Sequence, residues 1–177
     1  LAPDRSRTWF GLGDLLFHMG AVARIAGAED RARNAFERAL ALDSASVPAL
    51  LHLIELAARQ GDTAMVRRLM PLAEARDSPG DALEFLRWRA AVALGDEAAR
   101  LRIESGMDSL STFALFRILG WSQLDGLGME APARALAVLR RRTGTSAESQ
   151  YVFSNGVALA GNRGQFLAMR QAVGRYQ

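Results

Sequence analysis

Residues 49–62, ALLHLIELAARQGD, show most clearly which secondary structure this chain forms. The apolar residues of this stretch return every three or four positions, as an amphipathic helix requires, at Leu50, Leu53, Ile54 and Ala57. The last two residues of the stretch are Gly61 and Asp62. Aspartate is one of the residue types favoured at the start of a helix. We therefore expect one helix that ends at the glycine and a second helix that begins directly after it.

The same glycine recurs along the chain with a regular period. Glycines followed by an acidic or polar helix start stand 34, 34, 33 and 33 residues apart, at Gly27, Gly61, Gly95, Gly128 and Gly161. Each lies between two segments of helical period. The segments before the glycines are 9–24, 47–59, 82–94, 112–124 and 148–160, and those after them are 31–42, 64–75, 97–103, 131–139 and 165–173. A repeat of this length indicates ten helices in five antiparallel pairs.

One amphipathic helix pair cannot bury its apolar face alone, so successive pairs are expected to stack. No stretch shows the sustained apolar–polar alternation that predicts a strand. We expect an all-α fold, a right-handed α-solenoid of about five helix pairs, forming a single domain over residues 1–177. Its units are expected at about 9–43, 46–77, 79–106, 108–143 and 145–177.

Composition excludes several classes of protein. The 177 residues are 50% hydrophobic and 23% charged, which is too apolar for a disordered chain. The absence of cysteine excludes disulfides, thiolate metal sites and thiol nucleophiles. The longest stretch without a charged residue, 149–162, is too short and polar to cross a bilayer. We expect a soluble protein of the cytoplasm, without membrane insertion.

The residues of the first two units carry a family resemblance. In the first unit they are Trp9, Leu12, Gly13, Leu16 and Gly20, then Ala32, Phe36, Ala39 and Asp43-Ser44. In the second unit they are Leu50, Leu53, Ala57, Gly61, Val66, Met70 and Ala73. At these positions the chain resembles the tetratricopeptide repeat family, whose period is also about 34 residues. The resemblance implies that the first helices line a concave surface that binds peptide segments.

Two features depart from that family's pattern. The first unit holds about seven extra residues between Gly20 and Ala32, relative to the repeat period. Trp88 and Trp121 occupy positions where the family has a small residue for close helix packing. We expect looser packing or a different geometry in the third and fourth units.

Four phrases of the sequence point to a biological setting. They are TWFGLGDLLFHMG, ARNAFERALALD, ALLHLIELAARQGD and LEFLRWRAAVALGD. They are similar to repeat regions that follow the effector domain of bacterial signalling proteins, either a serine/threonine kinase or a winged-helix transcriptional activator. This resemblance implies a regulatory or sensory region, and the start at Leu1 without an initiator Met leads us to expect a segment of a longer protein. The alternative is a free-standing scaffold or chaperone that holds a partner peptide in its concave groove.

The glycine-anchored phase of the repeats predicts the residues of the concave face. They are Phe17, Arg24, Leu51, Glu55, Phe85, Arg89, Ile118, Ser122, Tyr151 and Asn155. Aromatic and arginine side chains are typical anchors in protein interfaces. The apolar members fit a helix core equally well, and both interpretations stay open. We expect a protein or peptide partner, and terminal repeats also allow oligomers.

No motif predicts catalysis, a cofactor or a metal. His18 and His52 lie 34 residues apart, but no third ligand is evident for a metal site. Glu55 and Glu84 lack the paired carboxylate that acid–base hydrolysis needs. The segment Gly126-Leu-Gly-Met-Glu-Ala131 matches a dinucleotide fingerprint, which requires a preceding strand where we expect a helix. We expect a turn there and no enzyme.

Charge is uneven along the chain. All 22 basic residues are arginine, and the net charge is +3. Residues 1–132 hold 15 Arg and 18 acids, a net of −3, whereas residues 133–177 hold seven Arg and one acid, a net of +6. The cluster Arg140-Arg141-Arg142 is typical of sites for nucleic acid or an acidic protein, and also of a solvated helix end. We favour the helix end and expect no nucleic acid partner.

Overall fold

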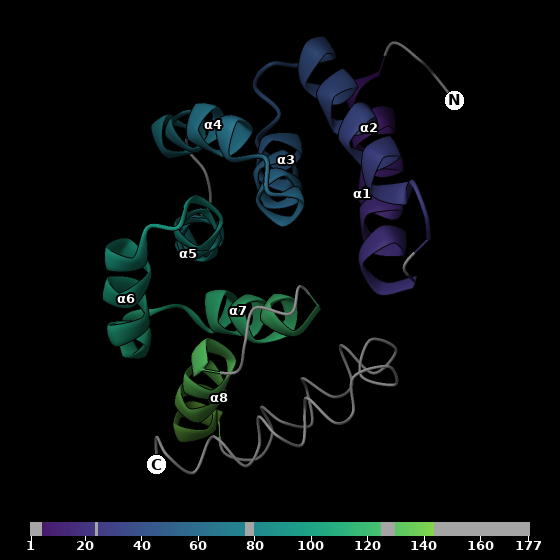
Figure 1. Ribbon diagram of the computed structural model, residues 1–177. Helices are drawn as coiled ribbons and strands as arrows, with labels where there is room; N and C mark the ends of the chain where they lie inside the picture. Colours follow the sequence, from purple (N-terminus) through teal and green to yellow (C-terminus); the bar gives the residue numbers. More distant parts are fainter. Residues whose placement is uncertain (1–4, 24, 77–79, 125–129, 144–177) are drawn as a thin grey trace. The chain divides into compact units, whose positions relative to one another are not determined.

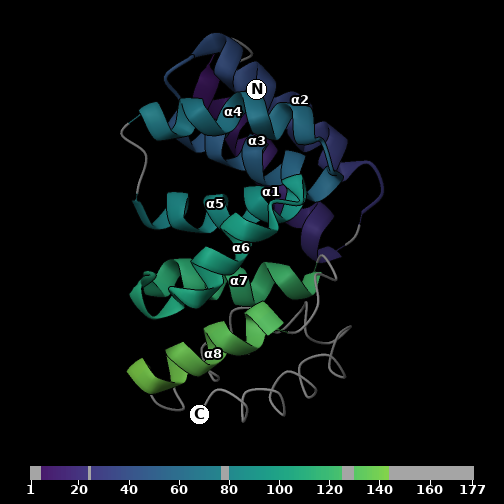
Figure 2. The ribbon, with the colours of Figure 1, turned by 60° about the vertical axis from the view of Figure 1, so that its left-hand side comes forward.

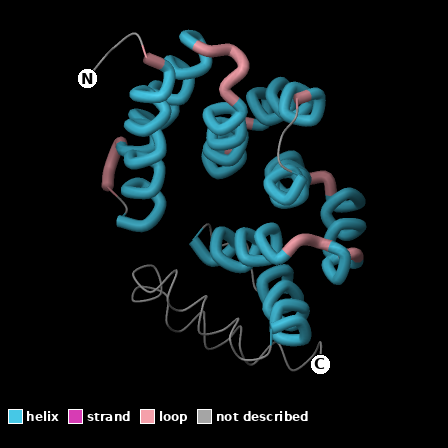
Figure 3. Tube along the Cα trace, turned by 180° about the vertical axis from the view of Figure 1, so that it is seen from behind, coloured by secondary structure: helices cyan, strands magenta, loops and turns pink. Residues whose placement is uncertain are grey.

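The computed structural model describes residues 5–23, 25–76, 80–124 and 130–143 (Figure 1). Within these ranges the chain forms helices and no strand, which confirms the predicted all-α class (Figure 3). The elements are α1 (Ser6–Ala23), α2 (Ala28–Leu42), α3 (Val47–Gln60), α4 (Thr63–Ala75), α5 (Gly80–Leu94), α6 (Glu97–Ser105), the 3-10 helix η1 (Met107–Ser109), α7 (Thr112–Leu124) and α8 (Glu130–Thr143).

The first eight predicted helices lie at or close to their predicted ranges. The last two, at 148–160 and 165–173, fall outside the described residues. The extra residues of the first unit lengthen its helices, because α1 has 18 residues and α2 has 15, against 14 in α3 and 13 in α4. The insertion is therefore accommodated mainly as helix.

The repeat is visible in the backbone at three glycines. Gly27 and Gly61 both have φ of 71°, and Gly95 has φ of 67°. This left-handed conformation is open to glycine at little cost and strained for other residues. Asp62, directly after the second of these glycines, caps α4, since its Oδ1 accepts a hydrogen bond from the Met65 amide at 3.0 Å. The predicted turn and cap are thus confirmed at this position.

The chain divides into two compact units, Leu1–Asp96 and Glu97–Gln177. The boundary falls between α5 and α6, inside the predicted repeat unit 79–106. One domain over residues 1–177 stays a prediction.

In the first unit, α1 and α2 pack against each other (Figure 2). They approach closely at two glycines. A Cβ atom built on Gly13 would lie 2.7 Å from the Phe36 ring, and one on Gly20 would lie 2.7 Å from Cγ of Glu29. Helix α3 packs against α2, α4 and α5. The largest apolar side chains of this core are Phe17, Phe36, Leu50, Ile54, Leu56, Phe85 and Trp88. Trp88 is fully buried, with its ring 6.4 Å from that of Phe85.

In the second unit, α7 packs against α8, and η1 contacts both α6 and α8. The core side chains of this pair include Leu115, Ile118, Leu119, Leu136 and Leu139. On α6, Arg100 pairs with Glu97 and with the buried carboxylate of Glu104 at 2.9 Å. An arginine therefore compensates the buried acid of this helix.

Candidate interaction surface

The structure places the predicted concave-face residues mostly in the interior. Among those it describes, five are buried and one is half-buried; the buried ones are Phe17, Glu55, Phe85, Arg89 and Ile118, and the half-buried one is Leu51. Arg24, Tyr151, Asn155 and the side chain of Ser122 lie outside the described residues. A partner cannot reach a buried side chain unless the helices move, so a candidate surface has to be sought among exposed residues.

Two of the buried residues carry charge. Glu55 on α3 and Arg89 on α5 belong to helices that pack against each other. Burying a charge is costly unless opposite charge and hydrogen bonds compensate it. Both side chains therefore belong to the interior of the first unit.

Asp14 brings the two histidines together. Its Oδ1 lies 3.4 Å from Nδ1 of His18, one turn later on α1, and 3.4 Å from Nε2 of His52 on α3. Nδ1 of His18 also lies 2.8 Å from the carbonyl oxygen of Asp14, which accepts if that nitrogen carries the proton. We call Asp14, His18 and His52 the His–Asp cluster.

Aromatic rings surround His52 and hold it in place. Its ring stacks on Phe36 at 5.1 Å and 5°, and it lies 5.1 Å from Phe17 and 5.8 Å from Phe10. No group of three or more acidic, histidine or cysteine residues in the described ranges could hold a metal ion. The cluster therefore offers one partly exposed carboxylate flanked by imidazoles, which carry charge only when protonated.

One side of α1 is exposed and combines charge with apolar groups. Leu15 is 59% exposed and Met19 is 36% exposed, so α1 carries two large exposed apolar side chains one turn apart. Gly11 lies on the same side, and nothing lies within 4 Å of a Cβ atom built there. Arg7 and Asp14 complete the surface, which we call the α1 face: Arg7, Gly11, Asp14, Leu15 and Met19. The three- and four-residue spacings place these positions on one side of a helix.

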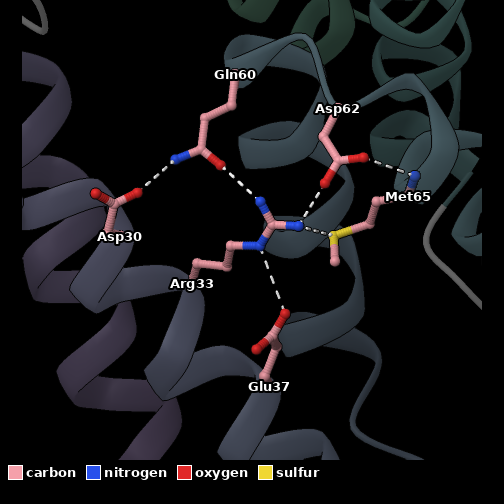
Figure 4. A network of polar contacts seen from close by, with 6 residues as sticks. All are labelled: Asp30, Arg33, Glu37, Gln60, Asp62 and Met65. Carbon is pink, nitrogen blue, oxygen red and sulfur yellow. Dashed lines mark hydrogen bonds and ion pairs between the residues drawn. The ribbon is translucent and has the colours of Figure 1, made fainter.

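A polar junction links α2 to the turn between α3 and α4 (Figure 4). Nη2 of Arg33 donates to Oδ2 of Asp62 at 2.5 Å, and its Nη1 donates to Oε1 of Gln60 at 3.1 Å. The amide hydrogen bond from Met65 and the Arg33 guanidinium lower the pKa of Asp62. Arg59 extends the junction through an ion pair with Glu29 at 2.6 Å. These contacts join consecutive repeats, so they are structural.

The arginine cluster is engaged within the second unit. Arg141 pairs with Asp108 at 2.6 Å, and Arg142 donates to the carbonyl oxygens of Leu110 and Asp108 at 2.8 and 2.6 Å. Two of the three guanidinium groups thus tie the end of α8 to η1. This contact supports the structural interpretation of the cluster.

The fingerprint-like segment follows a helix. Residues 112–124 form α7, as predicted, and no strand precedes residue 126 in the described part of the chain. The backbone geometry that holds a pyrophosphate begins at the end of a strand. The predicted turn itself lies mainly in residues 125–129, outside the described residues.

Sequence reasoning missed both the His–Asp cluster and the α1 face. Asp14 stands four residues before His18, a spacing that brings side chains together on a helix and could have signalled the pair. Its approach to His52 depends on how α1 and α3 pack, which no local pattern encodes.

The described part of the chain contains no helix with the length and apolar composition that a membrane crossing requires. A scan against family models, a search of curated proteins and a search of solved structures found no match to this chain.

Proposed function

We propose that this chain is a non-catalytic protein–protein interaction module, a right-handed α-solenoid of about five antiparallel helix pairs similar to tetratricopeptide repeats. The observation that carries the proposal is the recurrence of a left-handed glycine between successive helices. Gly27, Gly61 and Gly95 share the left-handed conformation at intervals of 34 residues. Arrays of such units commonly present extended surfaces for partners.

The α1 face is the surface on which we expect a partner to dock. Isolated exposed apolar side chains are normal on soluble proteins. Leu15 and Met19 differ because they stand one turn apart on the same helix, beside a glycine and a charged pair. Interfaces commonly combine an apolar centre with a polar rim in this way.

The biological setting rests on the resemblance of four sequence phrases. They are similar to repeat regions of bacterial signalling proteins, so we propose a regulatory role in the cytoplasm within a larger regulator. In that role the module would transmit or receive a signal through contact with a protein.

A displayed library of random peptides, selected against the immobilised 177-residue chain, tests the proposed interaction. Selected peptides should lose about tenfold or more in affinity when Leu15 is changed to Asp, because a charge would replace an apolar anchor. The matched control is Leu72→Asp on α4, where the leucine is 44% exposed, and binding should persist. Both sites are exposed, so circular dichroism should show folded protein in each case.

Two outcomes would contradict the proposal. If no peptide is retained, the chain does not act as a general peptide-binding module. If Leu72→Asp removes binding and Leu15→Asp does not, the docking surface is not the α1 face.

A further inference from the structure

We propose that the α1 face binds the α1 face of a second copy of this chain, with the two helices antiparallel and crossing at Gly11. The inference rests on the proposed function, because it names a partner for the same surface.

The charge pattern of the α1 face is complementary to itself. Arg7 stands four residues before Gly11, and Asp14 stands three residues after it. In an antiparallel pair that crosses at Gly11, Arg7 of one copy lies opposite Asp14 and Leu15 of the other. Two-fold symmetry then forms the same Arg–Asp contact twice.

Both charges are available for such a contact. Arg7 is exposed and forms no ion pair with any residue that the structure describes. The side chain of Asp14 is 42% exposed, and its close neighbours His18 and His52 are charged only if protonated. Arg7 of a second copy could therefore pair with Asp14, which has no arginine partner among the described residues of its own chain.

Gly11 provides the close approach that crossing helices need. It lies at the middle of the exposed side of α1, and nothing fills the space that its missing side chain leaves. In this register Gly11 of one copy faces Gly11 of the other, so the two backbones can approach closely, and Leu15 of each copy packs beside the crossing point. The 59% of Leu15 that is exposed in the single chain would then be covered.

The expected association is weak. One pair of crossing helices buries less than the roughly 1,200 Å² at the lower end of stable interfaces. The dimer should therefore form in proportion to concentration, and it would be favoured wherever the chain is held at high local density.

Sedimentation equilibrium of the full chain over a wide concentration range tests the proposal. Wild type should shift from monomer to dimer as concentration rises, and Leu15→Asp should stay monomeric. The matched control Leu72→Asp should dimerise like wild type.

A charge swap tests the antiparallel register. Arg7→Glu and Asp14→Arg should each abolish self-association, because each places like charges opposite one another. A mixture of the two variants should dimerise, since each chain then supplies the charge that the other lacks. The double variant should recover a dimer with itself.

The variant Gly11→Leu distinguishes an effect on dimer formation from an effect on folding. Leucine favours a helix more than glycine does, and the site has room, so thermal stability should hold or rise. The leucine side chain should nevertheless prevent dimer formation, because it fills the space at Gly11 where the two helices cross.

The proposal is overturned if wild type stays monomeric at every concentration, or if its dimer is indifferent to Leu15→Asp and Gly11→Leu. If the chain is monomeric while selected peptides still lose affinity for Leu15→Asp, the proposed self-association is wrong and the proposed interaction module stands. If neither dimer nor peptide binding is found, both proposals fail.

Discussion

At the scale of single residues, Gly11 and Gly13 show how two positions on one helix obey different constraints. Gly13 faces α2, where its hydrogen lies against the Phe36 ring, and Gly11 faces solvent. Packing against Phe36 leaves no room for a side chain at Gly13. At Gly11 there is room, and glycine is disfavoured there only by its low helix propensity. The repeat pattern of the sequence singles out Gly13, whereas Gly11 carries no signal.

Alanine at each position should separate these constraints. Gly13→Ala should lower the free energy of unfolding by about 1–3 kcal/mol, because the new Cβ would lie 2.7 Å from the Phe36 ring. Gly11→Ala should raise it by about 0.5–1 kcal/mol, the difference in helix propensity. Urea denaturation followed by circular dichroism measures both. Equal effects at the two sites would show that α1 and α2 do not approach as described.

At the scale of elements, the junction between α2, α3 and α4 joins a helix cap to an ion pair. Asp62 caps α4 and also accepts a hydrogen bond from Arg33 of the preceding repeat. The cap was predictable, because an acid directly after a glycine turn is a local signal. The partner on α2 was not, since it depends on how consecutive repeats pack.

Removal of Asp62 should show a pH-dependent loss of stability. The pKa of Asp62 is lowered in the folded chain, first by the Met65 amide and then by Arg33. Its contribution is therefore fully present above the ordinary carboxylate pKa of about 4 and is lost as the pH falls through the lowered value. Asp62→Ala should cost about 1 kcal/mol at pH 7, and the difference from wild type should shrink in acid. Urea denaturation at pH 7 and pH 3 measures this difference.

Asp62→Asn is the matched control, because asparagine still caps a helix but cannot pair with Arg33 as an ion. It should lose less stability than Asp62→Ala at pH 7. A cost for Asp62→Ala that is equal at both pH values would mean that the carboxylate charge makes no contribution.

At the scale of the whole molecule, the sequence predicts helices better than their assembly. The i, i+3, i+4 spacing at Leu50, Leu53 and Ile54 is a local property, and α3 lies where it predicts. The division after Asp96 has no such signal, because the repeat period continues across it. The predicted concave face illustrates the same limit. Phase alone selects Phe17 and Phe85, and only packing shows that they are buried.

Residues 1–96 should fold without the rest of the chain. Helices α1 to α5 belong to one compact unit that buries Phe36, Ile54 and Trp88. The fragment should give a helical spectrum and a cooperative thermal transition. A shorter fragment, 1–79, lacks α5 and should be less stable, because the sides of α3 and α4 that contact α5 would be exposed. A fragment 1–96 that binds hydrophobic dye and melts without cooperativity would disprove the division.

The turns at Gly27, Gly61 and Gly95 also bear on stereochemistry. Their backbone lies in the region that L-amino acids avoid and that their mirror images favour. A chain assembled by chemical ligation could therefore carry D-alanine at these three points without backbone strain. Each D-alanine would restrict the unfolded chain more than glycine does, so it should stabilise the fold. An L-residue at the same positions should destabilise it, because its backbone would be strained.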